Sequence, residues 1–360
     1  QDGIRDCLLS RGLGDVYKRQ NGMGVCFSFC VFHCYDVHTT SRFIGEEVMM
    51  KQLPYIIGVL LIAVPFVAPQ YPLHLIIMIL IWSLVYTAWS LMGRFGLVSL
   101  GHGAFMSIGA YVTALLWNYG GISPWIGIPA AMITAAIMAF LVAYPCFQFK
   151  IVGHYFALVT LALSEVVKLV IIACRDTTVC SLGFTPERHG EGTSIVAIQF
   201  ADKEVFYFVV LIAWGIGLLI WRAVDRSMMR FALDSISEDE DASAAAGVHV
   251  TASKLKITML SAVLTALGGA LYCQYQMFIG PEVIGGIGIS LQIVFAVVVG
   301  GLYTMMGPTI GAIITLLMTE VFRNLITSLR TQGIDLAGLD LSLIHISEPT
   351  RQEAISYAVV

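Results

Sequence analysis

The sequence predicts an all-α, polytopic membrane protein, a bundle of about eight or nine spanning helices. The composition is the first reason: 58% of the 360 residues are hydrophobic, only 12% are charged, and the mean hydropathy is +0.82. Soluble domains carry about 25% charged residues. The second reason is that the apolar residues gather in blocks close to the length of about 20 that crosses a bilayer as a helix. A net charge of −4 gives no indication of nucleic acid as a partner.

We expect three parts in the chain: a non-native N-terminal extension over 1–48, a transmembrane domain over 49–330, and a non-native or truncated tail over 331–360. The opening, DGIRDCLLSRGLGDVYKRQ, resembles translated sequencing-adapter DNA, and so does LSLIHISEPTRQEAISYA near the other end. Such segments are excluded from reasoning about the fold.

Nine apolar blocks follow one another in the middle part. Lipid offers no hydrogen-bond partners to the backbone, so each block is expected to be a helix or a broken helix buried in protein. The blocks are Tyr55–Ala68, Leu73–Met92, Phe95–Trp117, Trp125–Pro145, His154–Cys174, Val205–Trp221, Ile257–Met277, Ile289–Val299 and Gly311–Phe322.

The distribution of Lys and Arg predicts the orientation, because short cytoplasmic loops carry an excess of basic residues. With the N-terminus inside, the internal loops hold Lys51, Arg94, Lys150, Arg222, Arg226, Arg230, Lys254 and Lys256. The external side then holds Arg175, Arg188, Lys203, Arg323 and Arg330. This bias places the polar segment between the sixth and seventh blocks in the cytoplasm.

That polar segment, over about 234–248, contains four consecutive acidic residues, Glu238–Asp241. Ser237 and Glu240 have the spacing of a capping box, and carboxylates early in a helix suit its dipole. Gly247 is a suitable C-terminal cap. We therefore expect one short helix lying against the membrane, either as an ordinary solvated helix or as a docking site for a partner.

The third block contains GLVSLGHGAFMSIGAY, with four glycines and His102. Glycines weaken a helix and allow close packing. An ionisable residue in a span is costly and faces a partner or a cavity. His102 therefore either bonds a neighbouring helix and holds a break in place, or borders a path through the bundle.

The fifth block contains GHYFALVTLALSEVVKLV, with Glu165 near its middle. Lys168 follows at i+3, a spacing that lets the two side chains pair on one helix face. An intramembrane Glu is a functional candidate, and a structural ion pair is the alternative.

Four segments together resemble the membrane subunit of branched-chain amino-acid ABC importers, the LivM-like permeases. They are SLGHGAFMSIGAY, GHYFALVTLALSEVVKLV, SEDEDASAAAGVHVTASKL and VVVGGLYTMMGPTIGA, in the order and spacing of that family. The resemblance covers roughly Tyr55–Arg330 and implies the ABC importer permease fold.

The resemblance also implies a function: a multi-pass permease of the bacterial inner membrane that imports branched-chain amino acids or related small polar solutes such as urea and amides. Its partners would be ABC ATPase subunits, a second homologous permease, a periplasmic binding protein and the lipid bilayer. The ATPase contacts carried over are Glu238, Asp239, Glu240, Ala244, Ala245 and Gly247. Candidates for the translocation path are Ser99, Gly101, His102, Tyr155, Thr160 and Glu165.

The chain departs from the family pattern at Asp234, Ser237 and Asp241, which puts the choice of ATPase partner in question. We expect no enzymatic activity, cofactor or metal, since neither a Walker-type glycine loop nor a ligand cluster stands in the sequence. Two other classes stay open: an ion-coupled carrier or channel that uses Glu165, and a polytopic membrane enzyme that uses His102, His154 and Glu165.

Overall fold

The computed structural model describes residues 61, 63–66, 69–151, 153–173, 185–186, 198–199 and 202–331. The chain divides into two compact units, Gln1–Val67 and Ala68–Val360. In the first unit the described residues are helical. Most of the predicted span Tyr55–Ala68 lies outside the described residues, as do 1–48 and 332–360 of the predicted non-native ends, so those predictions stay predictions. The fold described below is that of the second unit.

Every element in the described part of the second unit is an α-helix. In chain order they are α3 (Gln70–Gly93), α4 (His102–Gly120), α5 (Pro124–Gln148), α6 (His154–Ala173), α8 (Lys203–Arg226), α9 (Met228–Glu238), α10 (Glu240–Ala245), α11 (Val250–Gln276), α12 (Pro281–Ile284), α13 (Ile287–Gly300) and α14 (Gly307–Thr331).

The predicted helical membrane bundle is confirmed. Seven helical stretches in the described residues are long and apolar enough to cross a membrane: α3, α5, α6, α8, α11, α14, and α12 with α13 as one stretch, Pro281–Gly300. The expected number of eight or nine was approximate. These seven correspond to seven of the nine predicted blocks, and the helices extend up to nine residues beyond the predicted ends.

The third predicted block, Phe95–Trp117, is broken, as its glycines and His102 led us to expect, and its helix begins only at His102. Helix α3 ends at Gly93, and the chain runs without helix to Gly101, the N-terminal cap of α4. Gly96 has φ +76°, in the left-handed region where other residues are strained. Residues 95–101 at the start of this apolar block are therefore not helical. Helix α4 is not among the seven candidate spans.

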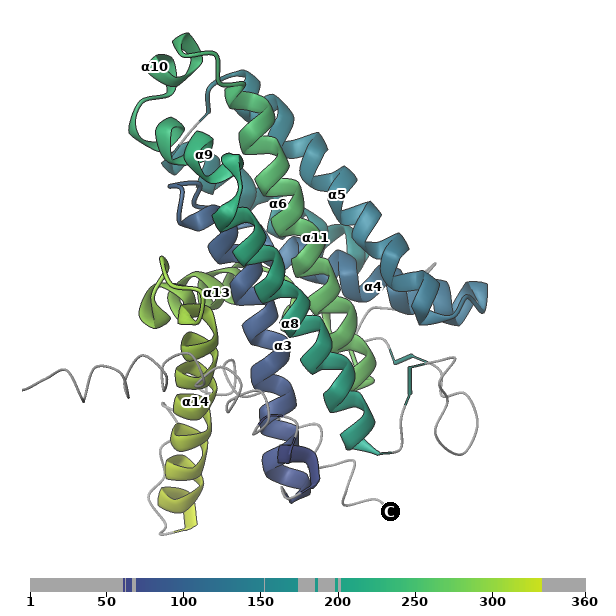
Figure 1. The fold of residues 1–360 in the computed structure, drawn as a ribbon. Coiled ribbons are helices and arrows are strands. Elements are labelled where there is room, and N and C mark those ends of the chain that lie inside the picture. The colour runs from purple at the N-terminus through teal and green to yellow at the C-terminus, as the bar shows by residue number, and fades with distance from the viewer. Residues whose placement is uncertain are drawn as a thin grey trace, which may run out of the picture. The chain divides into compact units, whose positions relative to one another are not determined.

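Helix α11 lies at the centre of the bundle and packs against α3, α4 and α5 (Figure 1). Its contact with α4 depends on two glycines. A Cβ on Gly109 would overlap the backbone of Ala266, and a Cβ on Gly269 would overlap the backbone of Met106. Small residues at such crossings let two membrane helices approach backbone to backbone.

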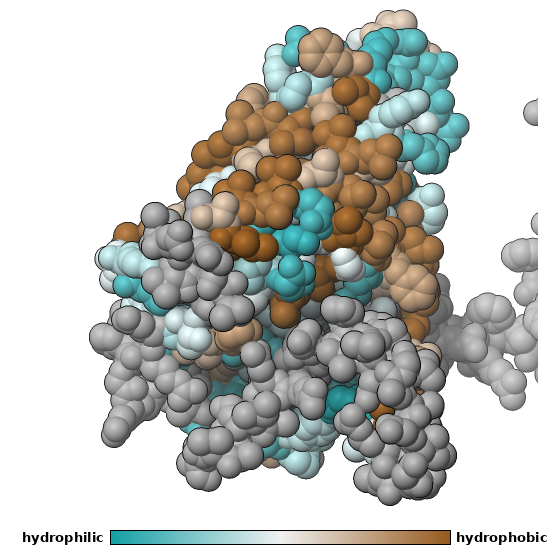
Figure 2. Space-filling model, turned by 180° about the vertical axis from the view of Figure 1, so that it is seen from behind, coloured by the Kyte–Doolittle hydropathy of each residue, from teal (hydrophilic) through white to brown (hydrophobic). Residues whose placement is uncertain are grey.

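The outer helices of the bundle expose apolar surfaces. In its most hydrophobic window α3 is 83% buried, whereas α6 is 28% buried and α14 is 17% buried. Figure 2 shows one face of the molecule as a broad brown field beneath a teal cap. An apolar surface this large is suited to lipid, and α3 is a core helix.

Candidate functional site

The polar segment between α8 and α11 folds as two helices, α9 and α10, at one end of the bundle (Figure 1). The prediction of one helix over 234–248 was wrong. Asp239 has extended backbone angles, φ −151° and ψ 113°, so it ends α9 and begins α10. Its carboxylate accepts the backbone N–H groups of Asp241 and Ala242 at 3.0 and 2.9 Å.

The predicted capping box does not form. The Ser237 hydroxyl donates to the carbonyl of Asp234 at 2.7 Å instead of capping a helix. Asp239 takes the capping position because its carboxylate reaches two free N–H groups of the next turn. At the other end, Gly247 has φ +91°, and its N–H donates to Ala244 O at 3.0 Å. The prediction that Gly247 terminates the helix is confirmed.

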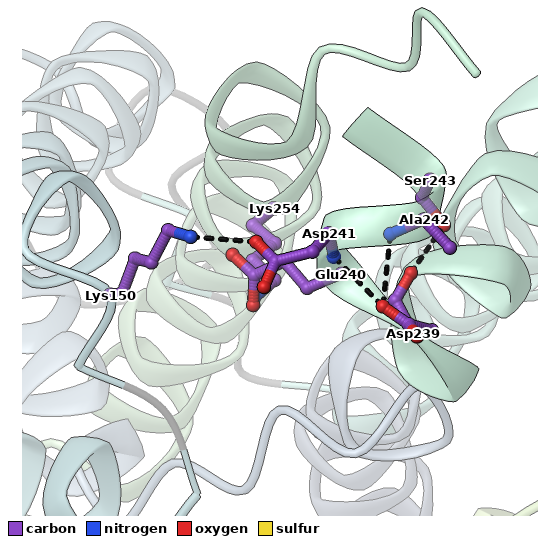
Figure 3. A network of polar contacts seen from close by, with 7 residues as sticks. All are labelled: Lys150, Asp239, Glu240, Asp241, Ala242, Ser243 and Lys254. Atoms are coloured by element: carbon purple, nitrogen blue, oxygen red, sulfur yellow. Dashed lines mark hydrogen bonds and ion pairs between the residues drawn. The ribbon is translucent and has the colours of Figure 1, made fainter. Parts of the chain in front are cut away.

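Two lysines tie α10 to the bundle (Figure 3). Lys254, near the start of α11, donates to the Glu240 carboxylate at 2.6 Å, and only 5% of the lysine side chain is exposed. Lys150, just beyond α5, donates to Asp241 at 2.7 Å. The first pair is shielded from water and the second is open, so the Glu240 pair is the one that fixes the position of α10.

The Lys150–Asp241 pair supports a prediction about pH. The hydrogen bond and charge of each partner lower the pKa of Asp241 and raise the pKa of Lys150. The stabilising contribution of Asp241 is therefore lost only as pH falls through its lowered pKa. That of Lys150 is lost only as pH rises through its raised pKa. Between pH 6 and 8 both groups stay charged.

We accordingly expect Lys150→Gln to change the melting temperature little, and by the same amount, across pH 6–8. The side chains of Lys150 and Asp241 are 67% and 84% exposed, and such pairs are screened by solvent. Thermal unfolding of the wild type and the variant in detergent at several pH values measures this. Curves that diverge between pH 6 and 8 would contradict the assignment.

The six predicted ATPase contacts lie together at this end. Five of them are exposed and Glu240 is half-buried: Glu238, Asp239, Glu240, Ala244, Ala245 and Gly247. On the opposite face of the segment, Leu233 and Ile236 are buried, as is Ser243 of α10. Leu233 packs into an apolar cluster with Trp221, Phe156 and other side chains of the bundle. The segment thus has an anchored face and an exposed face.

A second group of charges joins α9 to the ends of α3 and α8. Asp225, in the last turn of α8, accepts from Arg94 at 3.1 Å and from Arg230 of α9 at 3.0 Å. Arg230 also reaches Asp234 at 3.4 Å. The Arg94 guanidinium lies 4.3 Å from the ring centroid of Trp221. Basic residues that the sequence assigned to one side of the membrane therefore do gather at one end of the bundle.

The non-helical segment before α4 is held by side chains of neighbouring helices. Thr160 of α6 accepts the backbone N–H of Leu100 at 3.0 Å. The indole of Trp89 donates to the carbonyl of Ser99 at 2.7 Å. A Cβ on Gly101 would meet the backbone of Thr160 at 2.9 Å, so the chain passes close to α6. Irregular backbone in a membrane protein survives only where its polar groups are satisfied like this.

His102, the first residue of α4, is fully buried. Its Nε2 lies 2.8 Å from the Ser261 hydroxyl of α11, and that hydroxyl donates to the carbonyl of Ala88 at 2.6 Å. The serine proton is thus used, so Nε2 of His102 is the donor. This arrangement supports the alternative in which His102 bonds a neighbouring helix and holds the break in place.

Glu165 lies at the junction of α6 and α13. Its carboxylate pairs with Lys168 at 2.8 Å, which confirms the predicted i,i+3 pair. It also accepts the backbone N–H of Ile287, the first residue of α13, at 3.1 Å. Both side chains are partly exposed, at 30% for Glu165. Tyr155, by contrast, is highly exposed near the start of α6.

Several polar residues that join the helices were not predicted from the sequence. Ser290 accepts the N–H of Gly103 at 3.2 Å and lies 3.4 Å from the Ser164 hydroxyl, so α4, α6 and α13 meet there. Asp225 was also missed as the partner of Arg94. Serines in apolar helices are common, and no local spacing indicates contacts between residues more than a hundred positions apart.

Comparison with known proteins identifies the family of this chain. Residues 71–349 match the family described as branched-chain amino acid transport system / permease component. The chain belongs to this family. This permease is 26% identical over 298 residues to the high-affinity branched-chain amino acid transport system permease protein LivM of Salmonella typhimurium and to that of Escherichia coli. Each alignment covers 76% of this chain and 69% of the relative. No solved structure matches the chain.

The permease is therefore a transport subunit of an ABC importer and not an enzyme. An importer of this type works with ATPase subunits and a substrate-binding protein, and its permease crosses the membrane several times. The family expected from the four sequence segments is confirmed.

Proposed function

We propose that this permease imports branched-chain amino acids, or related small polar solutes such as urea and amides, across the bacterial inner membrane. Its residues 49–330 form the permease domain, and α9 with α10 is the coupling segment that docks on an ATPase subunit. A second homologous permease and a periplasmic binding protein complete the importer. The observation that carries the proposal is the exposed acidic and small-residue face of α9–α10, anchored to the bundle on its other side.

The exposed residues of α9 and α10 support the docking part of this proposal. Glu238 and Asp239 lie beside the exposed residues Ala244, Ala245 and Gly247. Small side chains let a partner approach the backbone closely, and carboxylates offer charged acceptors to basic groups of the partner. Departures from the family at Asp234 and Asp241 are explained locally, because both carboxylates pair with basic residues of this chain, Arg230 and Lys150.

Substrate transport is tested with the whole importer in proteoliposomes. The permease is purified with its own ATPase, binding protein and partner permease, and uptake of labelled leucine, isoleucine, valine, urea and acetamide is measured with and without ATP. ATP-dependent uptake of one of these classes supports the proposal. Uptake driven by a proton or sodium gradient without ATP would contradict it and favour the ion-coupled carrier.

We also propose that the faces of α4 and α6 around Ser99, Gly101, Thr160 and Glu165 border the translocation path, where His102 holds the break before α4 in place, with Tyr155 near the cytoplasmic end. The charged pair Glu165–Lys168 supports this, since a partly exposed pair at this depth is costly against lipid and suits water or a second permease. The broken backbone between α12 and α13 lies against the same pair, and irregular backbone does not face lipid.

Glu165→Gln is expected to lower uptake while what remains still requires ATP. The substitution removes the carboxylate charge and leaves Lys168 without its ion-pair partner. The double variant Glu165→Gln/Lys168→Met is the control, because it removes both charges. Uptake should recover partly in the double variant. If Glu165→Gln instead abolishes a response to a proton or sodium gradient, Glu165 is an ion site and the carrier class is favoured.

A further inference from the structure

The ion pair between Arg94 and Asp225 links the coupling segment α9–α10 to the end of α3. Asp225 uses one carboxylate oxygen, Oδ1, to accept from both Arg94 and Arg230. Arg230 belongs to α9, and Arg94 is the first residue after α3. One carboxylate therefore connects the coupling segment to the start of the non-helical segment 94–101.

Arg94 is held firmly in this place. Only 6% of its side chain is exposed, and its guanidinium lies against the rings of Trp221 and Phe95, with centroid distances of 4.3 and 4.7 Å. Among the described residues, its Nε and Nη2 have no hydrogen-bond partner. A buried guanidinium that loses its one carboxylate is strongly disfavoured. A displacement of Asp225 is therefore expected to carry Arg94 with it rather than break the pair.

The segment that Arg94 begins leads directly to the proposed path. Residues 94–101 end at the N-terminal cap of α4, where Leu100 is held by Thr160 and His102 by Ser261. These contacts join the segment to α6 and α11. The two unused nitrogens of Arg94, Nε and Nη2, offer Asp225 a second way to bind, with both oxygens engaged, without exposing the charge.

We propose that Arg94, Asp225 and Arg230 transmit movement of the coupling segment to the break before α4. They are positioning residues: they touch neither ATP nor substrate, and they act through the segment 94–101. The proposal rests on the proposed docking of α9–α10 on an ATPase, and it adds the route by which that docking changes the bundle.

The test is the ratio of substrate imported to ATP hydrolysed by the whole importer in proteoliposomes. Asp225→Asn keeps the shape of the side chain and removes its charge, so the ratio is expected to fall by about fivefold or more, the lower range of typical coupling between sites. ATP hydrolysis stimulated by the binding protein should continue. Asp225→Glu restores the charge and should restore most of the ratio. If Asp225 served only to pack against its neighbours, restoring the charge would not restore the ratio.

Arg230→Gln is the second variant, because Arg230 is half-exposed and the buried Arg94–Asp225 pair stays intact without it. It should lower the ratio without reducing the amount of assembled importer. Lys150→Gln breaks an open pair beside the same segment and is the matched control, with an unchanged ratio. The proposal is overturned if Asp225→Asn assembles and transports with the wild-type ratio, or if Arg230→Gln does so when Asp225→Asn fails to assemble.

Transport by the wild-type importer distinguishes a wrong transmission route from a wrong function. If the wild-type importer couples ATP to uptake and these variants keep its ratio, the transmission route is wrong and the proposed function stands. If the wild-type importer shows no ATP-dependent uptake at all, the proposed function is wrong and the inference falls with it.

Discussion

Replacing Glu238–Asp241 by alanine is expected to uncouple ATP hydrolysis from uptake while the permease still inserts and assembles. The four substitutions remove three exposed carboxylates and the half-buried one of Glu240. They also remove the Asp239 cap on α10, worth about 1 kcal/mol. Uptake per ATP should fall by about 5- to 150-fold, the usual range of coupling between sites. Proteoliposome uptake and phosphate release measure the two rates side by side.

The control for this variant concerns Lys254. Alanine at Glu240 leaves a buried ammonium unpaired, and breaking such a pair costs about 3–5 kcal/mol. A version that also carries Lys254→Met removes both charges and separates lost stability from lost docking. Uncoupling should persist in that version. Normal coupled uptake in either version would show that the acidic run has no part in docking.

Gly109→Ala is expected to destabilise the permease by about 1–3 kcal/mol, the usual cost of overpacking. The added methyl would overlap the backbone of Ala266, and a backbone cannot rotate away as a side chain can. Helices α4 and α11 would have to separate, and α4 carries His102 and the break before it. The melting temperature of the purified permease should fall, and less assembled importer should be recovered.

Gly215→Ala is the matched control, since the same methyl is added to a helix glycine with nothing within 4 Å. It should leave stability unchanged or raise it by up to about 1 kcal/mol, because alanine restricts the unfolded chain and favours a helix. Equal effects of the two substitutions would show that the close approach of α4 and α11 is not what limits stability.

The spanning helices could be predicted from sequence because length and apolar content decide them. Leu73–Met92 and Val205–Trp221 both became helices of 24 residues, α3 and α8. The pair Glu165–Lys168 was also predictable, since a spacing of three on a helix fixes its geometry. Local rules sufficed wherever the partner lay within one turn.

The break at Asp239 was not predictable by the same rules. Ser237 and Glu240 match a capping box, but helix α10 begins two residues later, where the Asp239 carboxylate accepts the backbone N–H groups of Asp241 and Ala242. Four adjacent acidic residues make several caps possible, and the Lys254 contact that favours one of them comes from the next helix.

The ion pair between Arg94 and Asp225 could not be predicted from nearby sequence either. Asp225 lies 131 positions away along the chain, and only the packing of α3 against α8 brings the two together. Likewise, sequence could name Ser99, Gly101 and Thr160 as candidates, but not that a threonine of α6 would hold the backbone before α4. Such contacts depend on the arrangement of the helices.

The most direct test of the coupling role of α9–α10 is a photo-cross-linking amino acid placed at Ala244, an exposed position of α10. Tyr119, exposed at the C-terminal end of α4, is the control position. After illumination of the assembled importer, we expect Ala244 to cross-link to an ATPase subunit and Tyr119 not to. An importer that transports normally, yet gives no ATPase cross-link from Ala244, would contradict the docking of this segment.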